Sequence, residues 1–288
     1  MSRSAGSRAN RRGELPPSPE PLPSPAVDSH THFDIAVGGE DRAPADAEVD
    51  EAIDAAVAVG VPRLVQVGVD VASSQWSAAL AARRPEVLAA VALHPNEAGA
   101  GAATDDALAE IDRLAALPRV RAVGETGLDR YRTGADGWAA QEASFRAHID
   151  IAKRHGVALV IHDRDAHDEV LRVLEDEGAP QHTVLHCFSG DAGFARRCIE
   201  RGYVLSFAGT LTFANAGSLR EAAALAPLDQ LLVETDAPFL TPVPYRGRPN
   251  AARLVPHAVR ALADVTGTDL GQLCAALTAT AERVFGRW

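Results

Sequence analysis

Histidines and carboxylates stand at the ends of short apolar runs along this sequence. Imidazole and carboxylate ligands suit Zn, Mn, Ni or Fe, and suit Mg less well. If the folded chain gathers these residues, they can hold divalent ions that activate a water molecule for hydrolysis. The residues concerned are His30, His32, His94, Glu125, His162, His186, Glu234 and Asp236.

The His30-Thr31-His32 unit is the most local of these signals. Residues i and i+2 of a strand point to the same face, so both imidazoles could ligate one ion. Taken alone the unit is weak, because two histidines at this spacing also fit core or surface positions. With the other members of the set at the ends of further runs, we expect a metal centre.

Glu125, in the segment VGETGLD, could join two ions. A carboxylate can bridge through its two oxygens, which a histidine cannot do. The alternative is a helix-capping or ion-paired carboxylate near Gly124. We expect two divalent ions, of Mg, Mn, Zn or Ni, with Glu125 between them: His30, His32 and Asp236 on one side, and His162 and His186 on the other.

Eight runs rich in Val, Ile and Leu alternate with longer segments of helical spacing. This pattern indicates βαβ units and a parallel sheet. Eight strands with such crossovers predict a closed (β/α)8 TIM barrel, with a doubly wound open sheet as the alternative. No GxGxxG follows the first run, which disfavours a dinucleotide-binding form. The expected strands begin near Val27, Leu64, Leu88, Val120, Ala158, Thr183, Tyr203 and Leu231, and the clearest helices span 45–59, 141–155 and 166–177.

The strands of a parallel barrel all end at one face, where barrel active sites are built. Closure of the barrel would therefore bring together chemically capable residues that lie far apart in sequence. We expect one domain over residues 26–288, with its active site at that face. Residues 1–25 are rich in Pro, Ser, Arg and Gly, and we expect a disordered tail that contributes no core.

Composition bounds the classes of function. The chain has 288 residues and a formal net charge of −11, so contact with a polyanion would have to be local or bridged by metal ions. We expect no membrane span, because every long apolar stretch carries charge. No obligate protein partner is evident from the sequence, and we expect none. Cys187, Cys198 and Cys274 show no CxxC spacing, which favours free thiols and a cytoplasmic location.

Seven segments together resemble the TatD family of metal-dependent deoxyribonucleases, a branch of the amidohydrolase-type barrels. The resemblance covers about residues 27–288. It implies phosphodiester hydrolysis in DNA, often as a 3′–5′ exonuclease on single strands, and metal roles for His30, His32, Glu125, His162, His186 and Asp236. The segments are DSHTHFD (28–34), ALHPNEA (92–98), GETGLDRYR (124–132), VIHDRDA (160–166), LHCFSG (185–190), ETDAPFL (234–240) and PYRGRPN (244–250).

Three positions depart from the usual pattern of that family. Ala251 and Ala252 stand where Glu-Pro is frequent. The asparagine that is usual shortly before Arg283 is absent, and Ala281 stands in that segment. None of the three changes removes a proposed ligand. The first two bear on substrate contacts after the eighth strand.

Metal-assisted hydrolysis would give further roles to three residues of the set. Asp236 could accept the proton of the attacking water as well as ligate, or it could be a ligand only. Glu234 lies two residues earlier, on the same face of the expected strand, and could order the water, hold a metal or support a ligand from behind. His94 could donate to the scissile phosphate or leaving oxygen, or be structural.

Phosphate recognition needs cations besides the metal ions. Arg246 and Arg248 follow the eighth strand, where barrel phosphate sites often form, and guanidinium groups suit phosphate. The alternative is a pair of surface-loop arginines. Weaker candidates are Arg130 and Arg132 for phosphate, and Tyr131 and Phe213 for stacking on a base.

The main hypothesis is therefore a metal-dependent nuclease that acts on single-stranded DNA. An amide, ester or lactone hydrolase, or a deacylase of aminoacyl-tRNA, is the alternative, because the barrel fold does not settle the substrate. A metal-binding scaffold without activity is a third interpretation. Intact ligands at every position argue against it.

Overall fold

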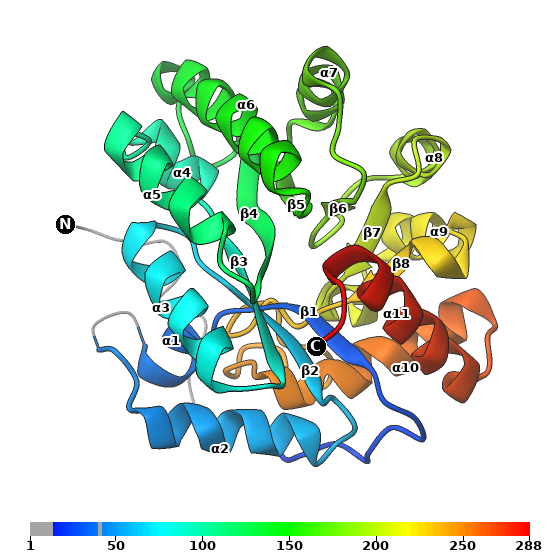
Figure 1. Cartoon of the computed structure of the whole chain (residues 1–288). Coiled ribbons are helices and arrows are strands. Elements are labelled where there is room, and N and C mark those ends of the chain that lie inside the picture. Colours follow the sequence, from blue (N-terminus) through cyan, green and yellow to red (C-terminus); the bar gives the residue numbers. More distant parts are fainter. Residues whose placement is uncertain (1–13, 40–41) are drawn as a thin grey trace.

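A ring of parallel strands surrounded by helices forms the body of the protein (Figure 1). The computed structural model describes residues 14–39 and 42–288. Within these residues eight strands follow one another in the order β1 to β8. They are β1 Val27–Thr31, β2 Arg63–Val67, β3 Val87–Val91, β4 Val120–Asp129, β5 Ala158–Arg164, β6 Thr183–Leu185, β7 Val204–Phe207 and β8 Leu231–Val233.

The helices lie outside the strands and cover them. Those expected over 45–59, 141–155 and 166–177 are present as α2, α6 and α7. None of the helices in the described ranges has both the length and the apolar character needed to cross a membrane. The α-helices are α1 Phe33–Gly38, α2 Asp46–Val57, α3 Val71–Arg83, α4 Pro95–Gly99, α5 Asp105–Ala115, α6 Trp138–His155, α7 His167–Glu177, α8 Ala192–Glu200, α9 Gly217–Leu225, α10 Val255–Thr266 and α11 Leu270–Phe285.

The ring is completed by the chain that follows β8. Thr31 of β1 forms an isolated parallel bridge with Ala237. The amide of His32 donates to the carbonyl of Ala237, and the amide of Asp236 donates to the carbonyl of His30, both at 2.9 Å. The prediction of a (β/α)8 barrel is confirmed, and the connection that completes it carries two of the predicted ligands.

Successive side chains of a strand point to opposite faces, so every second residue of each strand fills the interior of the barrel. The end of α11 closes the amino-terminal end of the barrel and packs against this interior cluster. Ala281, one of the departures from the family pattern, is buried there. The cluster includes Val27, Val65, Val67, Leu88, Ala90, Ala122, Val160, Val184, Val204, Leu232, Val284 and Phe285.

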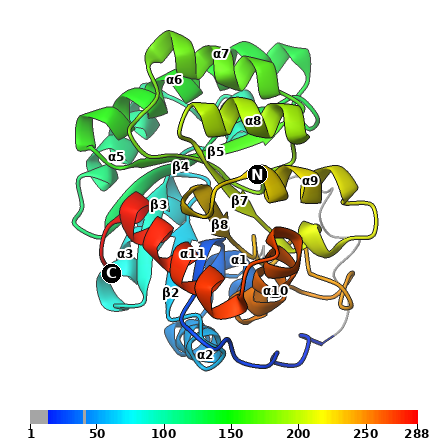
Figure 2. The same cartoon turned by 90° about the vertical axis from the view of Figure 1, so that its right-hand side faces the viewer.

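Residues 14–25 do not behave as the expected disordered tail. They run beside α2, α10 and α11 (Figure 2). Leu22 is 8% exposed, and its amide donates to the carbonyl of Val59 at 3.0 Å. Arginines of the body also hold the segment by donating to its backbone carbonyls: Arg248 to Glu14 and Leu15, Arg253 to Pro16, and Arg260 to Glu20 and Pro21.

The reason for this difference lies in the kind of contact. Extended, proline-rich backbone exposes its carbonyls, and these contacts need no apolar periodicity in the segment itself. The described part of the expected tail is therefore a strap on the barrel. Residues 1–13 lie outside the described residues.

Deleting residues 1–25 should destabilise the barrel more than deleting residues 1–13. The longer deletion removes the buried Leu22 side chain and several carbonyl acceptors, which together contribute about 2 kcal/mol or more to the free energy of unfolding. Chemical denaturation of both truncated proteins measures the difference. Equal free energies of unfolding would show that the strap adds nothing to stability.

Candidate metal centre

The predicted ligands meet at the carboxyl end of the strands, where a cavity of about 680 Å³ opens. His30 belongs to β1, Glu125 to β4 and His162 to β5. His32 and His186 directly follow β1 and β6, and Asp236 lies in the turn after β8. Closure of the barrel thus brings six residues from five strands together. They are His30, His32, Glu125, His162, His186 and Asp236, with His94 beside them.

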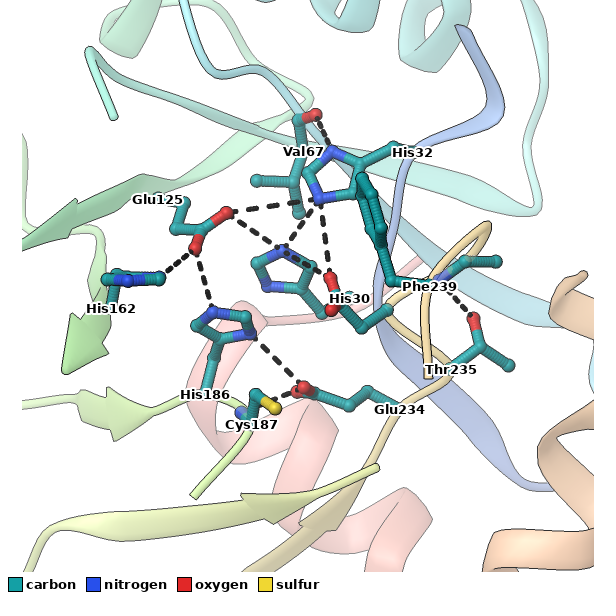
Figure 3. Close-up of polar contacts among 12 residues, drawn as sticks. His30, His32, Val67, Glu125, His162, His186, Cys187, Glu234, Thr235 and Phe239 are labelled. Carbon is teal, nitrogen blue, oxygen red and sulfur yellow. Dashed lines mark hydrogen bonds and ion pairs between the residues drawn. The ribbon is translucent and has the colours of Figure 1, made fainter. Parts of the chain in front are cut away.

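Glu125 lies between two groups of histidines (Figure 3). Its Oε2 is 3.5 Å from Nε2 of His30 and 3.9 Å from Nε2 of His32. Its Oε1 is 2.6 Å from Nδ1 of His162 and 2.9 Å from Nε2 of His186. Each carboxylate oxygen therefore faces its own pair of imidazoles, which is the arrangement that a bridging carboxylate needs.

The glycines around Glu125 allow β4 to approach β5 closely. Gly127 has a φ of 138°, and a Cβ there would lie 2.1 Å from the carbonyl oxygen of His162. Only glycine can occupy this position beside His162. The GETGLD segment thus brings the carboxylate and the imidazole into contact.

Asp236 completes the group around His30 and His32. Its Oδ1 is 3.6 Å from Nε2 of His32 and 3.9 Å from Nε2 of His30. The residue has a φ of 52°, in the left-handed region that few side chains occupy. Such conformations are often found at functional sites, where the surrounding structure maintains them.

The expectation that Glu234 shares a face with Asp236 is wrong. β8 ends at Val233, and the turn at Asp236 breaks the alternation of a strand. Glu234 is fully buried behind His186 instead. It accepts hydrogen bonds from Nδ1 of His186 at 3.1 Å, the amide of Cys187 at 2.8 Å and Oγ of Ser206 at 2.6 Å.

Three histidines have one ring nitrogen held by the surrounding structure. Nδ1 of His32 donates to the carbonyl of Val67 at 2.9 Å. Nε2 of His162 donates to Oδ2 of Asp129 at 3.2 Å, and His186 donates to Glu234. The second nitrogen of each ring faces the centre, so the surroundings fix both orientation and tautomer for metal binding.

His94 faces Glu125 from the wall of the cavity, and with Glu125 and His162 it forms a group that could hold a metal ion. Its Nδ1 accepts a hydrogen bond from the amide of Asn96 at 3.1 Å, so the proton of the neutral ring is on Nε2. That Nε2 lies 3.3 Å from Oε1 of Glu125. In this tautomer His94 is a donor toward the centre, and its role in catalysis stays a prediction.

The charge balance of the centre favours a cation. Burial opposes protonation of His32 and His162, but the neighbouring carboxylates raise the pKa of each to about 9. Burial lowers the pKa of His30 to about 3, which leaves it neutral. The histidines thus take up protons to balance the carboxylates, and a divalent ion can replace those protons. Imidazoles and carboxylates also fit the donor preferences of such ions.

Two aspartates of the site were missed by the reasoning from sequence. Asp28 accepts from the amide of Thr235 at 2.8 Å and from its Oγ at 2.6 Å, and it ties β1 to the chain after β8. Burial raises the pKa of Asp28 to about 8. Asp129 supports His162. Their positions in the sequence could have indicated them, because Asp28 lies two residues before His30 and Asp129 lies four residues after Glu125.

The arginines proposed for phosphate, Arg246 and Arg248, are not among the residues that line the cavity. Arg246 stacks over the ring of Phe213, with 4.0 Å between its Cζ and the ring centroid. Arg248 donates to the carbonyls of Glu14 and Leu15 in the strap. Among the described residues, the arginines that line the cavity are Arg132 and Arg164.

Comparisons with known proteins show the family of this chain. The family model described as TatD related DNase matches residues 27–286. The chain belongs to the TatD family. This confirms the resemblance of the motifs and the assignment as a metal-dependent hydrolase.

Relatives and solved structures extend the match over nearly the whole chain. A protein named uncharacterized metal-dependent hydrolase TatD from Mycobacterium tuberculosis is 48% identical over 264 residues, 90% of this chain and 97% of that protein. The 3′-5′ ssDNA/RNA exonuclease TatD of Citrobacter rodentium is 36% identical over 82% of this chain and 91% of its own. A solved TatD homologue from Escherichia coli K12 superposes with a TM-score of 0.83 at 26% identity, covering 90% of this chain and 97% of that one.

Glu125→Gln should remove most of the metal from this TatD-family protein. The amide is uncharged, and one of its two polar atoms becomes a donor that faces a group of histidines. Metal content after dialysis measures the loss. Glu234→Gln is the matched control, because it changes a carboxylate behind His186 and should only weaken affinity, by about 10- to 100-fold. Full metal content in Glu125→Gln would refute the bridging arrangement.

Metal uptake should release protons, and affinity should rise with pH. In the metal-free protein His32 and His162, with a pKa of about 9, are protonated at neutral pH and must lose those protons to ligate. His186 is protonated as well, because Glu125 and Glu234 outweigh its burial and hold its pKa well above the ordinary value. Apparent affinity should therefore increase from neutral pH to about pH 9. Calorimetry in two buffers of different ionisation enthalpy should count about three protons per protein. Uptake without proton release would contradict the charge balance.

Proposed function

We propose that this protein hydrolyses phosphodiester bonds of single-stranded DNA and removes nucleotides from the 3′ end. Two divalent ions, of Mg, Mn, Zn or Ni, would be held by His30, His32 and Asp236 on one side of Glu125 and by His162 and His186 on the other. The observation that carries the proposal is Glu125, whose two oxygens face separate groups of histidines. The printed activity of the Citrobacter relative supports the substrate class and direction.

The residues of this chain would divide the work of hydrolysis. When bound, a pair of divalent ions lowers the pKa of a water molecule and polarises a phosphoryl oxygen. Asp236 lies at the cavity wall and can accept the proton of the attacking water at a carboxylate oxygen. His94 can donate from Nε2 to the phosphate or to the leaving oxygen. Glu234 would keep His186 in place.

We also propose that the protein acts in the cytoplasm. Its three cysteines are free thiols, and two of them, Cys198 and Cys274, are buried. Thiols of this kind persist in a reducing compartment.

The activity is tested with a single-stranded oligodeoxynucleotide that carries a 5′ label. The metal-loaded protein should give a ladder of shortened products that keep the label, and chelation should stop the reaction. A blocked 3′ end should slow it. The same strand in RNA, a duplex, a p-nitrophenyl ester and a lactone are the comparison substrates. Turnover of the ester or lactone without cleavage of either nucleic acid would refute the proposal.

His94→Ala should lower kcat in the same assay by about 100-fold or more, with metal content unchanged, because it removes a proton donor and no ligand. His155→Ala is the control, since His155 lies on the surface in α6 and pairs with Asp112. A full kcat in His94→Ala would exclude the donor role.

A further inference from the structure

Two arginines on the wall of the cavity lack an acidic partner. Arg132 follows β4 and Arg164 ends β5, and both line the cavity. Within residues 14–39 and 42–288, neither guanidinium forms an ion pair with a carboxylate. Many arginines elsewhere are paired, including Arg83 and Arg146. Two unpaired cations are notable in a chain of net charge −11.

Two carboxylates of the cavity lining, those of Asp163 and Asp191, contact groups other than these arginines. Oδ2 of Asp163 lies 2.7 Å from Nδ1 of His167. Oδ1 of Asp191 accepts from the amide of Phe194 and caps α8. The arginines are therefore available to an anionic ligand.

The turn that carries Arg132 is tied to the metal centre. Oδ1 of Asp129 accepts from the amides of Tyr131 and Arg132, at 2.9 and 2.7 Å. Oδ2 of the same carboxylate lies 3.2 Å from Nε2 of His162. One buried side chain thus fixes the turn and a predicted ligand together, so the position of the turn relative to the centre is set.

Arg164 stands one layer above His162. The two residues are i and i+2 on β5, so they share a face and are about 6.6 Å apart along the strand. Arg164 pairs in register with Asp129 of β4. Its Cζ lies 4.6 Å from the ring centroid of Tyr131, a residue that is 66% exposed. The ring supports one face of the guanidinium and leaves its N–H groups for a ligand.

Another part of the cavity lining carries apolar side chains. They include Phe213, Phe239, Leu219 and Leu240. An apolar wall with an aromatic ring suits a nucleobase, whereas a wall with two arginines suits a phosphate. These two parts of the lining therefore match the two chemical parts of a nucleotide.

Resting on the proposed function, we infer that Arg132 and Arg164 bind the phosphate next to the scissile one in a single-stranded substrate. The metal centre at the floor receives the scissile phosphate, and the arginines stand above it toward the opening. Tyr131 and Asp129 are positioning residues, because they act through Arg164 and through the turn.

The test compares two substrates that differ in their number of phosphates. The p-nitrophenyl ester of thymidine 5′-monophosphate has one phosphodiester and no neighbouring phosphate, whereas a short oligothymidylate has several. Arg132→Ala and Arg164→Ala should each lower kcat/KM on the oligonucleotide about tenfold, mainly through KM, and leave the ester unchanged. The salt dependence on the oligonucleotide should fall by about 0.7 in logarithmic slope for each lost contact.

Conservative variants and a matched control sharpen the test. Tyr131→Leu should reproduce part of the selective loss of Arg164→Ala, and Tyr131→Phe should retain activity, because the ring face is kept. Arg121→Ala is the control. Arg121 is exposed and also belongs to β4, but it does not line the cavity.

Each outcome decides the assignment. An equal loss on both substrates would place the arginines on the scissile phosphate and overturn the inference. No loss on either substrate would overturn it as well, while leaving the nuclease function intact. A metal-loaded wild-type protein that cleaves neither substrate would refute the proposed function and, with it, this inference.

Discussion

A carboxylate buried among imidazoles is the constraint on which the site depends. Glu125 is 4% exposed, and burial alone would raise its pKa. The histidines around it, led by His186 and His94, more than offset the burial and hold its pKa well below the ordinary value. A buried ionised group costs several kcal/mol unless it is paired. Positive charge must therefore stand on both sides of Glu125, as protons or as metal ions.

The need to pair Glu125 determines how the neighbouring strands are arranged. Each imidazole can present only one nitrogen to the centre, and for three of the histidines another group holds the second nitrogen. Val67 at the end of β2 does this for His32, Asp129 of β4 for His162, and Glu234 after β8 for His186. Because these partners come from different strands, the geometry of the centre depends on closure of the whole barrel. The contact of Asp28 with Thr235 contributes to this closure, because it joins β1 to the chain after β8.

The strands and the six facing residues could be predicted from sequence because they depend on local patterns. A run of Val, Ile and Leu that ends in histidine or carboxylate marks both a buried strand and its functional end. Glu234 could not be placed, since the left-handed turn at Asp236 breaks the alternation that the prediction assumed. The strap was not predicted because its contacts are made by backbone carbonyls. Every residue type has a backbone carbonyl, so the sequence carries no signal for such contacts. Arg248 was assigned to phosphate for the same reason, since its acceptors are the carbonyls of Glu14 and Leu15.

The distribution of arginine reconciles an acidic protein with a polyanionic substrate. A net charge of −11 repels DNA at long range, but screening limits that repulsion to about 8–10 Å in physiological salt. Arginines pair with carboxylates on the outer helices, as in the cluster of Arg146 with Glu142 and Asp176. The proposed nucleic-acid substrate would meet a different balance of charge inside the cavity. Arg132 and Arg164 line the cavity without a carboxylate partner among the described residues, and divalent ions at the centre would add positive charge, so local electrostatics at the mouth of the barrel would favour phosphate although the molecule as a whole does not.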